Sequence, residues 1–75
     1  MSKTIEITSE FAANVWKVVA KAGDRVEADS VLVILESMKM EISVSSDLAG
    51  NVIEVTVQEG QTIAEGQLLA RVSIV

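Results

Sequence analysis

The residues most able to do chemistry lie together in the middle of the chain, in a stretch E-S-M-K-M-E-I that begins at Glu36. Lys39 stands between Met38 and Met40, and Glu41 closes the group on the other side. The chain contains no histidine and no cysteine. Ser-His-Asp catalysis, Cys-His catalysis and thiolate metal sites are therefore excluded, and one amine with two carboxylates remains.

Lys39 is poorly suited to act as a nucleophile without help. A catalytic lysine generally lies in a desolvated pocket or beside another cation, whereas Lys39 has a glutamate on each side. No convergent set of acids, bases or metal ligands can be assembled around it. We therefore expect that this protein is not itself an enzyme, and that Lys39 is modified by another protein that activates the donor.

The amino-acid composition narrows the classes of partner that can be expected. Six basic and eleven acidic residues give a net charge of −5, and no Lys/Arg cluster could meet a phosphate backbone, so nucleic acid is not expected. The first residues contain neither a signal-peptide core nor a transmembrane run, which predicts a cytoplasmic protein without a membrane partner. Residues 1–75 are expected to form one small domain that is a monomer when isolated.

The chain repeats itself with an offset of 37 residues. Residues 3–38 align with residues 40–75 without a gap, and Lys39 is the joint between them. The identical pairs are Ile5/Ile42, Ser9/Ser46, Ala12/Ala49, Asn14/Asn51, Val15/Val52, Val18/Val55, Gly23/Gly60 and Leu32/Leu69. Two copies are too few for a solenoid. A closed pair of halves related by a pseudo-twofold axis is predicted instead, with both termini at the end opposite Lys39.

Each half has the period of β-strands. Apolar residues alternate with polar ones at positions 53–57, and Trp16 aligns with Ile53. Residues 10–22 alone also fit an amphipathic helix, but their counterpart N-V-I-E-V-T-V is rich in β-branched residues. The repeat therefore favours strands throughout, with Trp16 in the core.

Turns are predicted between these strands. Gly23 and Gly60 stand at equivalent positions, where a positive φ costs glycine little. Asp29 aligns with Gly66, and aspartate is among the few other residues that tolerate a left-handed turn. The chain is therefore expected to be all-β.

The central hairpin has one pairing that places its apolar residues on one side. If Met38 and Lys39 are the turn, the inner pairs are Ser37/Met40, Leu35/Ile42 and Val33/Val44, and the outer pairs are Glu36/Glu41 and Ile34/Ser43. Met40 then faces inward and is expected to fill the core, while Met38 is exposed in the turn. Met-Lys is a poor hairpin turn, and paired glutamates repel each other. Such local conflicts are typical of functional sites.

These residues carry a family resemblance. The central E-S-M-K-M-E-I, with V-W-K-V-V-A-K-A-G-D before it and G-N-V-I-E-V-T-V-Q-E-G-Q after it, resembles the biotinyl/lipoyl attachment domain of the biotin carboxyl carrier type. The resemblance extends from about Phe11 to Val72. It implies a flattened barrel of two four-stranded sheets related by a pseudo-twofold axis, also called a barrel-sandwich hybrid.

The resemblance also implies a function. Lys39 would carry biotin in amide linkage, attached by a biotin protein ligase that recognises Met38 and Met40, while Glu36 and Glu41 help to align the hairpin. The biotin would carry a carboxyl group from a biotin carboxylase subunit to a carboxyltransferase subunit. The protein would supply position and reach.

Two alternatives stay open. One is a lipoyl carrier, since Ser37 also occurs in the Glu-Ser-Asp-Lys-Ala pattern of lipoyl domains, although Met38 and Met40 depart from that pattern. The other is an interaction module whose hairpin is never modified, which leaves Lys39 unexplained. The sequence also departs from the family in its first half, where Ala13 and Asp29 replace frequent glycines, and this bears on stability more than on function.

Overall fold

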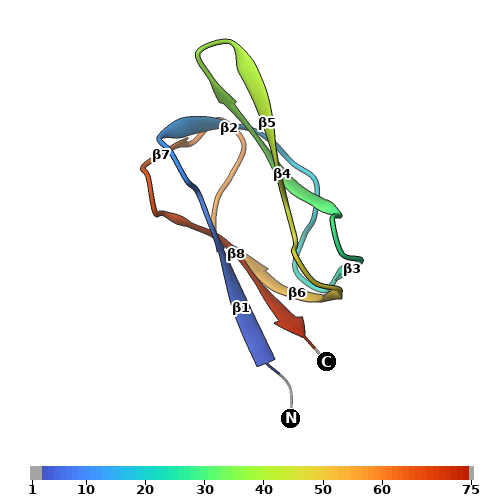
Figure 1. Ribbon diagram of the computed structural model, residues 1–75. Helices are drawn as coiled ribbons and strands as arrows, with labels where there is room; N and C mark the ends of the chain where they lie inside the picture. Colours follow the sequence, from blue (N-terminus) through green and yellow to red (C-terminus); the bar gives the residue numbers. More distant parts are fainter. Residues whose placement is uncertain (1–2, 75) are drawn as a thin grey trace.

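The computed structural model describes residues 3–74, which form eight β-strands and no helix (Figure 1). The strands are β1 (Lys3–Thr8), β2 (Ala13–Val18), β3 (Arg25–Val26), β4 (Val31–Ser37), β5 (Met40–Ser45), β6 (Gly50–Val55), β7 (Thr62–Ile63) and β8 (Leu68–Ile74). They make two four-stranded antiparallel sheets with the orders β1-β8-β6-β3 and β5-β4-β2-β7. The predicted all-β class and the two sheets are confirmed.

The strands repeat with the same offset as the sequence. Each of β1 to β4 has a counterpart of equal length 37 residues later, from β5 to β8. Replacing every strand of one sheet by its counterpart produces the order of the other sheet. Both sheets combine strands from both halves, so each half completes the other.

Hydrogen bonds repeat together with the strands. Ser9 and Ser46 are buried, and the hydroxyl of each donates to a carbonyl two residues later, at 2.5 Å and 2.6 Å. The amide of Asp29 donates to the Ser46 carbonyl and the amide of Gly66 to the Ser9 carbonyl, both at 2.7 Å. Buried polar groups need such partners, and the repeat supplies them in pairs.

The core lies between the two sheets and is built from both halves. Its buried side chains include Leu32, Leu35, Leu69, Val72, Val15, Val52 and Ile63. Residues 10–22 contribute β2 and the loops beside it, so the helix considered for this segment does not form. The turns are as predicted, with positive φ at Gly23, Gly60, Gly66 and Asp29.

The prediction that Trp16 lies in the core is wrong. Val15 pairs with Leu35 but Lys17 pairs with Ile34, so Trp16 is the additional residue of a β-bulge. Its side chain is 51% exposed, and that of Ile53, in the equivalent bulge of β6, is 47% exposed. A bulge inserts one residue and resets the in-out alternation. Val15 and Val52 take the buried positions instead.

The molecule is elongated, with extents of 40 × 18 × 17 Å. The β4–β5 hairpin projects at one end, and the start of β1 and the end of β8 lie at the other (Figure 1). This is the arrangement that the repeat predicts, and it leaves the hairpin tip unobstructed. Within residues 3–74 no helix could span a membrane.

Candidate functional site

The β4–β5 hairpin brings together all five residues that the sequence singles out. Its pairing is as predicted, with Ser37 opposite Met40, Glu36 opposite Glu41 and, further along, Leu35 opposite Ile42. Met38 and Lys39 are the two residues between the strands. The inward position of Leu35 in the core fixes this pairing, because a slip by one residue would turn Leu35 outward.

The turn has an unfavourable backbone for its residue types. Met38 has φ 52° and Lys39 has φ 66°, so both lie in the left-handed region. Two consecutive positive φ angles are typical of the type I′ hairpin turn, which prefers Asn-Gly or Asp-Gly. A left-handed conformation costs an ordinary L-residue roughly 1–2 kcal/mol. The hairpin therefore displays these two side chains at an energetic cost.

The three central side chains all project into solvent. Met38 is 93% exposed, Met40 is 65% exposed, and Lys39 is exposed between them. Met38 was expected to be exposed, and that prediction is confirmed. No described residue forms an ion pair with Lys39, so its amine is accessible to a partner.

The prediction that Met40 fills the core is wrong. Met40 does lie on the inner side of the hairpin, but exposure rises toward the tip. Leu35 is fully buried, its partner Ile42 is only partly buried, and Met40 is the last residue before the turn. The hairpin extends beyond the opposing sheet, so the inward direction at Met40 points into solvent.

Glu36 and Glu41 face each other across the strands and are both exposed. Like charges in directly opposed positions destabilise a sheet by about 0.2–1 kcal/mol. The ion pairs formed within residues 3–74 involve Arg71 and neither of these carboxylates. They remain as unneutralised charge beside the lysine.

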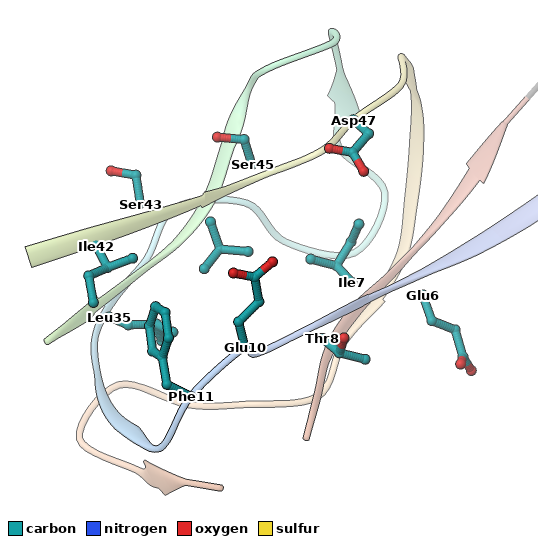
Figure 2. Close-up of a pocket in the computed structure, with 11 residues that line it drawn as sticks. Glu6, Ile7, Thr8, Glu10, Phe11, Leu35, Ile42, Ser43, Ser45 and Asp47 are labelled. Atoms are coloured by element: carbon teal, nitrogen blue, oxygen red, sulfur yellow. The ribbon is translucent and has the colours of Figure 1, made fainter. Parts of the chain in front are cut away.

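A pocket of about 340 Å³ lies below the hairpin, between the end of β1 and the inner side of β5. Figure 2 shows Phe11 near Leu35 and Ile42, with the carboxylates of Glu10 and Asp47 at the same pocket. Glu10 and Asp47 are equivalent in the repeat, so the pocket straddles the pseudo-twofold axis. It does not include the tip. Among the residues that the structure describes, no cluster of potential metal ligands was found.

The arrangement presents a lysine to a partner. An exposed amine projects at the tip of the hairpin, with two exposed thioether side chains beside it and the carboxylates of Glu36 and Glu41 in the adjoining strands. A covalently attached group fits this position, since nothing in the described chain covers Lys39. Sequence reasoning missed the exposure of Trp16 near this hairpin, because strand alternation alone carries no signal of a bulge.

Known proteins resemble this chain over nearly its full length. The family model described as "Biotin-requiring enzyme", of the biotin/lipoyl type, matches residues 3–72. The biotin/lipoyl attachment protein of Bacillus subtilis is 45% identical over 67 residues, which cover 89% of this chain and 92% of that protein. The biotinylated protein TB7.3 homolog of Mycobacterium leprae is 44% identical over 68 residues, covering 91% and 96%.

Two solved structures of proteins that contain such a domain resemble this fold. The urea carboxylase of Kluyveromyces lactis superimposes with a TM-score of 0.87 at 33% identity, over 93% of this chain and 6% of that one. The lipoyl domain of the 2-oxoglutarate dehydrogenase complex from Azotobacter vinelandii superimposes with a TM-score of 0.78 at 27% identity, over 91% and 94%. The chain therefore belongs to the biotin/lipoyl attachment family, whose members are carrier domains with a covalently attached cofactor.

Proposed function

We propose that this protein is a biotin carboxyl carrier in which Lys39 is the attachment site. The observation that carries the proposal is the projection of Lys39 between Met38 and Met40, all three exposed on a strained turn. Exposed apolar side chains grouped on one surface are typical of partner contacts. The relative named as a biotinylated protein supports biotin as the cofactor.

The attachment step needs an external enzyme. A biotin protein ligase supplies an activated biotin carboxyl group. The neutral Nζ atom of Lys39 bonds to that carboxyl carbon, the activating group leaves with the electron pair of its bond, and the nitrogen loses one proton and keeps one N–H in the amide. Met38 and Met40 offer the contacts by which the ligase selects this lysine. Glu36 and Glu41 flank the turn and help to hold the hairpin in the ligase site.

The carrier role follows from the shape of the molecule. Biotin held on Lys39 would supply the carrying chemistry, namely acceptance of a carboxyl group at a biotin carboxylase subunit and its release at a carboxyltransferase subunit. The chain supplies reach, because the hairpin projects at one end of a molecule whose longest extent is 40 Å. The start of β1 and the end of β8 lie at the opposite end from the tip, away from the site that the tip enters (Figure 1).

A lipoyl carrier is the second candidate. The similarity to the solved lipoyl domain favours it, because the two folds superimpose over nearly the whole chain. Met38 and Met40 argue against it, since lipoyl hairpins resemble Asp-Lys-Ala at these positions. The fold is common to both cofactors, so the choice depends on the residues at the tip.

Intact-mass measurement tests the proposal. The wild type is produced once with a biotin protein ligase and biotin and once with a lipoate ligase and lipoate, beside Lys39→Ala and the matched control Lys21→Ala, which removes another exposed lysine. We expect one biotin-sized increment on the wild type and on Lys21→Ala, and none on Lys39→Ala. A lipoyl-sized increment instead would favour the lipoyl carrier, and no increment in either case would leave an unmodified interaction module.

A further inference from the structure

The repeat allows the outer faces of the two sheets to be compared at equivalent positions. In sheet β1-β8-β6-β3, Arg71 pairs with Glu6 on one side and Glu54 on the other. Arg71 forms ion pairs with both glutamates, and the one to Glu6 is 3.2 Å long. The guanidinium also donates hydrogen bonds to both carboxylates. These hydrogen bonds raise the pKa of Arg71, and the one to Glu54 contributes most. The charges of this row are paired within the chain.

The same row in the hairpin sheet has different chemistry. Ile34 replaces Arg71, with Ser43 on one side and Lys17 on the other. Trp16 lies in the bulge beside this row and is about half exposed. The fold requires a bulge residue here but no aromatic one, because Ile53 occupies the equivalent bulge in the other sheet.

The next row toward the tip differs as well. In the hairpin sheet it contains Glu36 and Glu41, whereas the equivalent row in the other sheet contains Ser73 and Thr4. Neither glutamate has an ion-pair partner in the described chain. We call the outer surface of Trp16, Lys17, Ile34, Glu36 and Glu41 the hairpin face. It combines an apolar centre of Trp16 and Ile34 with the cation of Lys17 and two carboxylates without ion pairs, and its acidic end adjoins the turn that contains Lys39.

A ligase has a particular need for such a surface. An enzyme that acts on the finished carrier can grip the cofactor, but a ligase meets a bare lysine. Lys3, Lys17 and Lys21 are also exposed, so an accessible amine alone does not identify Lys39. Tryptophan is among the residues most often responsible for binding energy at protein interfaces, and complementary charge gives specificity.

We propose that the hairpin face is the surface on which the biotin protein ligase docks, with Trp16 entering an apolar depression and basic side chains of the ligase opposite Glu36 and Glu41. This inference rests on the proposed function. It assigns selection of the correct lysine to a sheet surface in addition to the residues of the turn.

The test is the kinetics of biotin transfer by the ligase to unmodified carrier, measured as a function of carrier concentration. Trp16→Ala is expected to raise KM for the carrier about tenfold, as loss of an interface anchor does, with kcat unchanged. Trp16→Ile, which installs the residue of the equivalent bulge, is expected to raise KM less. Ile53→Ala is the matched control on the opposite face and is expected to behave as wild type.

A second pair of variants tests the charges. Glu36→Gln and Glu41→Gln are expected to raise KM and to weaken its dependence on salt, because screening acts on the attraction that these variants remove. A general loss of structure would not change the salt dependence, and thermal unfolding of each variant checks the fold.

Three results would overturn the inference. The first is a KM of Trp16→Ala equal to that of the wild type. The second is a rise in KM for Ile53→Ala as large as that for Trp16→Ala. The third is an effect of Trp16→Ala that is seen only when a biotin carboxylase carboxylates the biotinylated carrier. A wild type that the ligase does not modify would overturn the proposed function first. The two failures are therefore distinguishable.

Discussion

The strain in the hairpin turn leads to a quantitative prediction. Met38 and Lys39 both hold left-handed backbones that Asn-Gly adopts readily. The double variant Met38→Asn/Lys39→Gly should therefore fold to a more stable protein, although it destroys the proposed attachment site. The turn would then be a place where stability is sacrificed to display two side chains.

The size of the effect follows from the backbone. Each ordinary residue in a left-handed conformation costs roughly 1–2 kcal/mol, and glycine in place of lysine returns about 0.5–1 kcal/mol through its larger loss of conformational freedom. Asparagine relieves part of the cost at position 38. The variant should gain about 1–2 kcal/mol of unfolding free energy. For a domain of this size each kcal/mol raises Tm by about 4–8 °C.

Urea and thermal unfolding of the unmodified proteins measure this gain. The matched control is Lys17→Gly, which removes a lysine from β2, where φ is not positive. Glycine within a strand should cost about 0.5–1 kcal/mol, so the same exchange has opposite signs at the two positions. If the turn variant were no more stable than wild type, the assignment of strain to Met38 and Lys39 would be refuted.

Three further predictions concern the scaffold. Gly66→Ala should lose about 1–2 kcal/mol through its positive φ alone, since a Cβ there would contact nothing within 4 Å; an unchanged urea midpoint would contradict this. Gly50→Ala should lose at least about 1–3 kcal/mol of unfolding free energy through overpacking, because its Cβ would lie 2.2 Å from the backbone oxygen of Ser73. Retained stability would show instead that β6 and β8 can separate locally. Leu35→Ala should lose about 2–5 kcal/mol of unfolding free energy, because Leu35 is fully buried, whereas Met38→Ala should leave thermal unfolding unchanged, because Met38 is 93% exposed. Similar losses in both variants would contradict the division between core and tip.

The internal repeat explains why so much of the fold could be predicted. Residues 10–22 alone were ambiguous between helix and strand, and their β-branched counterpart in the other half resolved the ambiguity. The same comparison predicted the turns at Gly23 and Gly60 and the left-handed conformation of Asp29. Each half served as an independent observation of the same local structure.

Two residues show where prediction failed. Trp16 follows the alternation of its strand but occupies a bulge, and Met40 follows the alternation of its strand but lies beyond the opposing sheet. The alternation of apolar and polar residues predicts only on which side of a strand a residue lies. It does not state whether an additional residue interrupts the strand, or whether another layer covers that side.

The sequence by itself determined the position of Lys39, the residues around it, the pairing of the hairpin and the division of the chain into two equivalent halves of β-strands. These features depend on local residue types and on the 37-residue repeat. Only the tertiary structure decided which apolar side chains are exposed, namely Met40 at the tip and Trp16 on the hairpin face. Burial depends on where one sheet ends relative to the other and on where a bulge shifts a strand. Those relations arise only when the two halves pack together.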